Sequence, residues 1–448
     1  MSLSIANLIK VKEIRTKILI TPGLLFCYRI GFQVPLPGVN LSRFLDAAAS
    51  GPTEGFGRLI GIMNVLTGAR LQQASLFSLG VMPYISASII LSLMVKVVPS
   101  LEKLSKEGQS GQRKINRYTR YLTIPICLVQ SFFVIFGALS GAEGELLHEG
   151  VRQYELLYYI LVMISLTTGT LFIMWLGEQI SEHGVGNGIS LIIMAGIVAD
   201  LPRAFTAYFG SDDGMSSQAY QTLLLFLAVW AAAVIAVVYM TKAQRRIPIQ
   251  QAKQTRGRRV YGGQRHFLPL KVNHAGVMPI IFASALLIVP PIVGGALGID
   301  FLENFALRAG FWYILTFAVL IFFFSFFWTS LMFQPNDMAD NLKEHGSFIP
   351  GIRPGKATAE FLEQTMVRIT LAGAAFLTVV ALFPTLVGSG FAGLDTTLIY
   401  FMSGTSILIV VSVALDLVEK INALLIMRNY EGFMKESNVP ARGWGRQK

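Results

Sequence analysis

Long apolar runs alternate with basic loops along the whole chain, and this alternation restricts the fold more than any other feature. A run of about 20 largely uncharged residues can cross a bilayer as a helix, because its backbone polar groups then pair within it. The chain has 53% hydrophobic and 14% charged residues, and it is therefore more apolar than soluble proteins, which average about 25% charged residues. The sequence predicts an all-α membrane protein with ten transmembrane helices, beginning near Ile18, Ser75, Tyr118, Tyr154, Gly188, Gln218, Asn273, Gly310, Val367 and Thr397.

The placement of the basic residues predicts the orientation of these helices. A net charge of +11 could indicate nucleic-acid binding, but 29 of the 37 Lys and Arg residues fall in alternate segments, as the positive-inside rule expects. The segment at residues 177–187 departs from the rule, since it carries Glu178 and Glu182 and no basic residue. Both termini are predicted to be cytoplasmic. The predicted cytoplasmic segments are the N-terminus, residues 96–120, 177–187, 242–271 and 334–366, and the tail from Lys420.

The first apolar run could instead be a cleaved signal peptide, because basic residues precede it. Pro22, Gly23 and Arg29 interrupt the run, and it lacks a small-residue cleavage site, so a retained first span is expected. Cys27 and Cys127 lie in separate spans without metal or haem spacing and are expected to be packing residues.

An internal repeat divides the chain. Residues 80–88 read GVMPYISAS and residues 276–284 read GVMPIIFAS, and seven of these nine positions are identical. Each copy opens the second span of a five-span half, and an odd number of spans gives the halves opposite orientations. A chance recurrence of a Gly–Pro helix start is the alternative. The predicted units are residues 1–217 with spans 1–5, residues 218–419 with spans 6–10, and a cytoplasmic tail at 420–448.

Three further segments are distinctive. Residues 55–71 are glycine-rich and interrupted by charges, so they cannot span a bilayer alone; their composition favours a peripheral outer helix over one that folds back into the protein. In the loop 242–271, alternation around Arg258–Tyr261 predicts a β-hairpin. In the loop 334–366, the sequence FIPGIRPG predicts two Pro-Gly turns that hold Arg353 at a fixed tip. Such basic loops usually serve topology or anionic lipid, and docking of a ribosome or motor protein is the alternative.

Reactive groups are scarce in the predicted spans. Arg29 is the one clear mid-span charge and could extend to the interface, while ion-coupled transporters need ionisable groups at this depth. No metal, phosphate-loop or nucleophile motif is present, so neither an enzyme nor a cofactor is expected. Aliphatic pairs follow helix breakers at Val81 and Ile85 and at Ile189 and Ile193. They could form ordinary packing, or a gasket that blocks ions and parts for larger solutes.

Several motifs occur in one collinear series, and together they resemble the SecY family, the channel subunit of the bacterial protein translocase. The resemblance covers nearly the whole chain. The motifs are RIG at 29–31, PLPG at 35–38, GVMPYISASII at 80–90, KEGQSGQR at 106–113, GVGNGIS at 184–190, LPLK at 268–271, GVMP at 276–279 and IPGIRPG at 349–355.

The resemblance implies a clamshell of two five-helix halves around an hourglass pore, which passes unfolded secretory proteins across the membrane and releases membrane-protein helices sideways into lipid. A secondary transporter with five-plus-five inverted repeats is the runner-up. The implied lateral gate lies between spans 2 and 3 on one side and spans 7 and 8 on the other. The family's constriction ring falls on Val81, Ile85, Ile189, Ile193, Ile281 and Ile409, with Val81 smaller than the isoleucine common there.

The resemblance also implies a plug and a set of partners. Residues 55–71 resemble the plug beneath the ring, and the residues that represent it are Gly61, Ile62, Asn64 and Gly68. This resemblance replaces the interpretation of the segment as a peripheral helix. The basic loops resemble the docking surface for the SecA motor ATPase or a ribosome, through Arg353 first and then Arg258, Arg259 and Lys271. Further implied partners are SecE, SecG, signal peptides, nascent polypeptides and membrane lipids, with no nucleic acid beyond the ribosome. The implied location is the bacterial cytoplasmic (inner) membrane.

Overall fold

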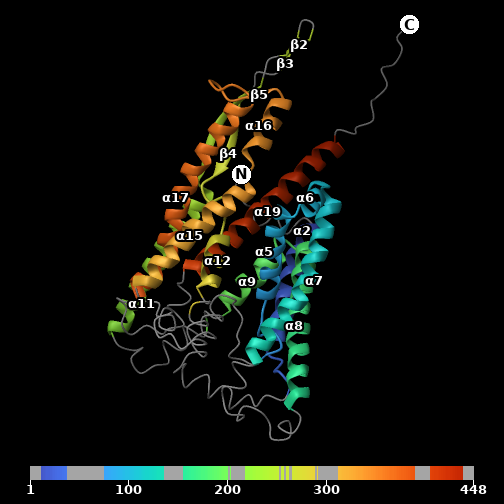
Figure 1. Ribbon diagram of the computed structural model, residues 1–448, viewed down its shortest axis with the longest axis vertical. Helices are drawn as coiled ribbons and strands as arrows, with labels where there is room; N and C mark the ends of the chain where they lie inside the picture. Colours follow the sequence, from blue (N-terminus) through green and yellow to red (C-terminus); the bar gives the residue numbers. More distant parts are fainter. Residues whose placement is uncertain are drawn as a thin grey trace, which may run out of the picture.

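The computed structural model describes residues 12–37, 75–135, 155–199, 202, 217–251, 254–256, 259–261, 265–287, 290, 311–388 and 404–436. Helices dominate this part of the chain (Figure 1). They are α2 (Lys12–Gly31), α5 (Met82–Val97), α6 (Pro99–Lys106), α7 (Gln109–Val134), α8 (Glu155–His183), α9 (Gly188–Val198), α11 (Ser217–Lys242), α12 (Met278–Leu286), α15 (Phe311–Met332), α16 (Pro335–Glu344), α17 (Lys356–Gly388) and α19 (Gly404–Glu436). The strands are β1 (Gln244–Gln251), β2 (Gln254–Arg256), β3 (Arg259–Tyr261), β4 (Arg265–Lys271) and β5 (Ser347–Phe348).

A helix occupies each of the ten apolar runs, although some of these helices are short. Three described stretches, Leu156–His183, Phe311–Glu344 and Lys356–Phe383, are long and apolar enough to cross a bilayer alone. The pair α5 and α6, bent by 99° at a short break, would make a fourth. The molecule is therefore a helical membrane protein, and the count of ten spans stays a prediction.

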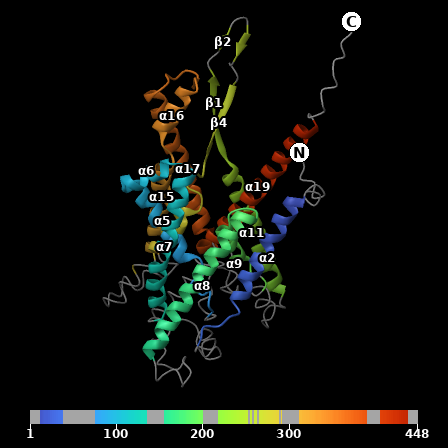
Figure 2. The ribbon, with the colours of Figure 1, turned by 90° about the vertical axis from the view of Figure 1, so that its right-hand side faces the viewer.

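The described helices gather in two groups joined by α19 (Figures 1 and 2). Helices α2, α5, α7 and α8 pack beside one another, and α12, α15 and α17 form the second group. Helix α19 packs against both α9 and α17. Its buried residue Leu408 belongs to the apolar core of the second group, while Leu417 packs on the core that includes Tyr28 and Ile173. One helix thus contributes to both cores.

The two repeat copies adopt the same local structure. Gly80 and Gly276 have φ of 57° and 64°, a backbone conformation that glycine adopts without strain. A helix begins two residues after each glycine, with Pro83 or Pro279 in its first turn, where the missing N–H of proline costs no helical hydrogen bond. In each copy, the fifth residue after the glycine donates its N–H to the carbonyl of the residue directly after the glycine, at 3.0 and 3.3 Å. The sequence repeat is therefore also a repeat of backbone geometry.

The loop expected at residues 177–187 is mostly helical, which corrects its boundary. Helix α8 continues to His183, because residues 177–183 contain no proline and only Gly177 as a weak helix former. The chain then turns at Gly184 and Gly186, and α9 begins at Gly188. The connection between the two helices is thus only four residues long.

Short polar elements lie toward one end of the molecule in both views (Figures 1 and 2). Helix α6 leads back from α5 to α7, and its Lys106 pairs with Glu102 at 2.9 Å. This hydrogen bond lowers the pKa of Glu102 and raises the pKa of Lys106. The strands β1 and β4 form an antiparallel ribbon in which Gln244 faces Lys271 and Gln250 faces Arg265. Strands β2 and β3 pair near the ribbon's tip, which confirms the predicted hairpin.

The junction of α8 and α9 depends on close backbone contact. The amide of Gly188 donates to the Ser181 hydroxyl at 2.8 Å, and the side chain of Asn187 caps α9 by accepting from the Ile189 amide at 3.2 Å. A Cβ atom on Gly188 would overlap the Gly177 carbonyl. Thr21 of α2 accepts from the Val185 amide at 3.1 Å, so three helices meet here.

We expect Gly188→Ala to destabilise the protein by about 1–3 kcal/mol, because the added methyl group must push α8 and α9 apart. Thermal unfolding of the purified protein in detergent measures the effect as a lower Tm. Gly23→Ala is the matched control, because a Cβ atom there meets nothing within 4 Å. Equal melting temperatures for the two variants would contradict the close contact.

Candidate functional site

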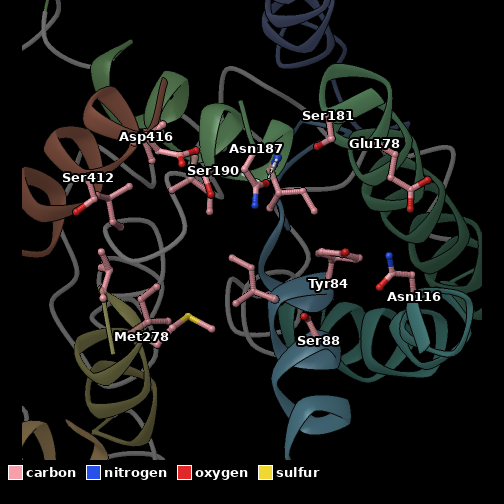
Figure 3. Close-up of a pocket in the computed structure, with 18 of the residues that line it drawn as sticks. Tyr84, Ser88, Asn116, Glu178, Ser181, Asn187, Ser190, Met278, Ser412 and Asp416 are labelled. Carbon is pink, nitrogen blue, oxygen red and sulfur yellow. Dashed lines mark hydrogen bonds between the residues drawn. The ribbon is translucent and has the colours of Figure 1, made fainter. Parts of the chain in front are cut away.

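A cavity of about 840 Å³ lies between the two helix groups. Helices α5, α7 and α8 form one side of it, and α12 and α19 form the other, with α9 between them (Figure 3). Six helices of the described structure build this cavity together, and its volume could admit another molecule. Its position at the junction of the groups makes it the candidate functional site.

Five of the six residues predicted for the constriction ring line this cavity. They are Ile85 on α5, Ile189 and Ile193 on α9, Ile281 on α12, and Ile409 on α19. They come from four different helices, and all five line the same cavity. The structure therefore brings these five predicted residues together, and their role as a seal stays a prediction.

The sixth predicted ring residue, Val81, lies elsewhere. Its side chain is 2% exposed and belongs to the apolar core that includes Phe77, Ile173 and Leu191. It precedes the first residue of α5 and is not among the residues that line the cavity. In this structure, Val81 is a packing residue of the first helix group.

Polar side chains share the cavity with the isoleucines. Figure 3 shows Ser88 and Asn116 on one side, Ser190 near the centre, and Ser412 on α19 opposite. Hydroxyl and amide groups can exchange hydrogen bonds with a polypeptide backbone or with water. The cavity thus combines an aliphatic wall with scattered neutral donors and acceptors.

Two ion pairs stand in the lining. Arg120 Nε on α7 lies 2.7 Å from Glu178 Oε1 on α8, and Lys420 Nζ lies 3.0 Å from Asp416 Oδ2 one turn earlier on α19. Glu178 and Asp416 are thus each balanced by a neighbouring cation. Among the residues that the structure describes, no group of three or more His, Cys, Asp or Glu side chains is placed to hold a metal ion.

Sequence reasoning missed Tyr84, Met278 and the pair of Arg120 with Glu178. Arg120 lies near the start of the third predicted span and Glu178 near the end of the fourth, and these opposite charges could have predicted the ion pair. Met278 lies one helical turn before Ile281, so it falls on the same face of α12. Arg29, the predicted mid-span charge, places its guanidinium 5.9 Å from the Phe32 ring centre and is not part of the cavity lining.

The predicted tip at Arg353 is held as the sequence indicated. Gly351 and Gly355 have φ of 86° and 102°, the Arg353 side chain is exposed, and its carbonyl accepts from the Thr358 hydroxyl at 2.9 Å. Beside it, the buried Ile349 anchors the turn in an apolar core. The two predicted Pro-Gly turns are therefore confirmed.

This turn and the ribbon form one unit, which we call the docking unit and define as β1, β4, β5, α16, residues 349–355 and the first half of α17. Strand β5 pairs with β1, where Phe348 faces Gln250. Ile247, Leu270, Ile349 and Leu362 share the apolar core of the unit.

Of the remaining residues predicted for partner docking, the structure describes two and leaves one outside the described residues. Lys271 is exposed at the end of β4, and Arg259 begins β3. Arg258 and the predicted plug residues Gly61, Ile62, Asn64 and Gly68 lie outside the described residues.

Comparison with known families identifies this arrangement. The model of the SecY family matches residues 75–418, a span that contains all five isoleucines of the cavity and the docking unit. The chain belongs to the SecY family. Proteins named protein translocase subunit SecY are similar to this SecY-family chain over nearly their whole length. The Streptomyces griseus protein is 41% identical over 96% of this chain and 99% of its own, and the Escherichia coli K12 protein is 40% identical over 97% and 96%.

Solved structures share the fold of this SecY-family chain. A structure described as that of a protein conducting channel has a TM-score of 0.57 and 19% identity, and it covers 99% of this chain and all of its own. Sec61 from the canine ribosome–channel complex of the endoplasmic reticulum has a TM-score of 0.54 and 18% identity, with the same coverage. At such identities the likeness establishes the fold.

We expect the ion pair between Arg120 and Glu178 to couple α7 to α8 weakly, because both side chains are partly exposed and such pairs contribute about 0.2–1 kcal/mol. Arg120→Glu and Glu178→Arg should each lower the Tm by placing like charges together. The double variant should recover part of the loss. A double-mutant cycle on thermal unfolding measures this coupling, and strictly additive effects would contradict the contact.

Proposed function

We propose that this chain is the central subunit of a gated protein-conducting channel, which passes unfolded secretory proteins across the membrane and releases membrane-protein helices sideways into lipid. One observation carries the proposal. In a chain of the SecY family, four helices from both groups place five isoleucines around a single cavity. Family membership favours this channel over the ion-coupled transporter that the sequence left open.

The isoleucines supply the seal. A narrow aliphatic ring excludes water and therefore blocks ions, while its flexible side chains can separate when a polypeptide enters. The neutral polar groups around the ring let the entering backbone keep hydrogen bonds. In the resting state, residues 55–71 serve as the plug beneath this ring, with Gly61, Ile62, Asn64 and Gly68 as its core.

Sideways release requires the two helix groups to part. The cavity already lies between α5 and α7 on one side and α12 on the other, and α15 packs on α12. A lateral gate between α5 and α7 and the pair α12 and α15 would open this cavity to lipid. A hydrophobic segment in the cavity would then transfer into the bilayer because burial of its apolar surface is favourable.

The proposed topology has ten spans in two inverted halves, residues 1–217 and 218–419, with the tail at 420–448. The matching helix starts after Gly80 and Gly276 support this arrangement. The ribbon, α6 and α16 lie toward one end of the molecule, as expected for cytoplasmic segments (Figure 2). Both termini would be cytoplasmic, and the membrane would be the bacterial inner membrane.

The docking unit offers a surface for a partner that drives translocation. Its exposed Arg353 and Lys271 are cations on a rigid core, which suits an anionic surface of a SecA motor or a ribosome. Arg258 and Arg259 would add further cations to the docking site. SecE and SecG would cover parts of the membrane-facing helices, and signal peptides and nascent chains would enter the cavity. The partner or the proton-motive force supplies the energy.

We expect a cysteine placed at Ile85 or Ile409 to crosslink to a stalled secretory precursor that carries a photoprobe in its mature region, because both side chains line the cavity. Immunoprecipitation of the adduct measures this. A cysteine at Val379, which is exposed on α17 and does not line the cavity, is the control. Crosslinks confined to lipid or neighbouring helices would reject the pore.

We expect Arg353→Glu to abolish or strongly reduce motor-driven export while the protein stays inserted and assembled, because the change reverses the charge at the tip of the docking unit. Export into inverted membrane vesicles measures the effect. Lys343→Glu on α16 is the matched control, since it makes the same charge change on the same unit away from the tip. Normal export by Arg353→Glu would remove Arg353 from the docking site.

A further inference from the structure

The two repeat copies contribute unequally to the cavity. In the second copy, Val277, Met278 and Ile281 all line it. In the first copy, Tyr84, Ile85 and Ser88 line it, and Ile85 is the one aliphatic residue among them, whereas Val81, the counterpart of Val277, is buried in the first helix group. The aliphatic wall is thus built more heavily from the start of α12 than from the start of α5.

Met278 lines the cavity, and Val81 does not. It is the first residue of α12, and Figure 3 shows its thioether extending into the cavity toward α5. Its side chain is partly exposed and lies on the same helix face as Ile281. Val81 could reach the cavity only if the start of α5 turned its buried side out of the core around Phe77.

We infer that Met278 is the sixth sealing side chain of this channel and a contact of the translocating chain, in place of Val81. This inference rests on the proposed channel function and names a further residue of the same site. Methionine is unbranched and polarisable, so it fills gaps of varied shape, whereas the branched valine side chain is stiff. A seal that must close around unrelated polypeptides gains from one unbranched member with more rotatable bonds than the β-branched isoleucines.

The test compares single cysteines at Met278, Val81 and Met82 in a channel whose Cys27 and Cys127 have been replaced and which still exports. Each variant is assembled in membrane vesicles with a stalled precursor that carries one cysteine, and disulfide formation is measured. We expect crosslinks from Met278→Cys as strong as those from Ile281→Cys, and only background from the other two. Met82 is the repeat counterpart of Met278 and does not line the cavity, so it is the matched control.

The outcomes separate this inference from the channel function itself. Crosslinking from Val81→Cys, with or without Met278→Cys, would overturn the assignment while Ile85→Cys still crosslinks. Failure of Ile85→Cys and Ile409→Cys as well would reject the pore rather than the choice of its sixth residue.

A second measurement addresses the seal in the resting channel. We expect Met278→Ser to raise the ion leak across the vesicle membrane several-fold, because a hydroxyl group retains water that an aliphatic group excludes. Met278→Leu should leave the leak at the level of the unchanged channel. If Met278→Ser does not assemble, a charged thiol reagent added to assembled Met278→Cys channels should produce the same leak. An unchanged leak in either form would overturn the sealing role.

Discussion

Helix α19 is the element on which the site depends, because it contributes to both apolar cores at once. Its buried Leu408 packs in the core of α12, α15 and α17, and Leu417 packs on the core built around α2, α8 and α9. Between these two residues, Ile409, Ser412 and Asp416 face the cavity. The same helix therefore joins the groups and keeps a space between them.

The chemistry of the cavity follows from what a bilayer permits. Backbone groups in an apolar medium pair within helices, so the spare hydrogen-bonding groups are side chains placed where helices diverge. Ser88, Ser190 and Ser412 are of this kind, and Glu178 and Asp416 are each paired with a cation. A surface of isoleucine with a few neutral polar groups has little preference for any one solute. This suits a passage for many different polypeptides.

Much of the fold was readable from the sequence, because its signals are periodic or local. Apolar runs marked the helices, alternation marked the hairpin, and Pro-Gly pairs marked the turns around Arg353. Aliphatic spacing and the family resemblance together predicted the ring, and the structure places Ile85 and Ile409 in one cavity lining, while their role as a seal stays a prediction. The sequence does not indicate that Val81 is buried, because the rotation of a helix start decides whether a valine faces a core or a cavity. The pairing of Arg120 with Glu178 likewise depends on how α7 meets α8.

The shared core of the docking unit constrains how the chain can change over time. Ile247 in the ribbon lies about a hundred residues before Ile349 in the turn and Leu362 on α17, yet the three share one apolar core. A larger side chain at one of these positions requires a smaller one at another. The two loops must therefore be inherited as a matched pair. In a chimera that takes one loop from a distant relative, the side chains of the two loops would pack poorly in this core.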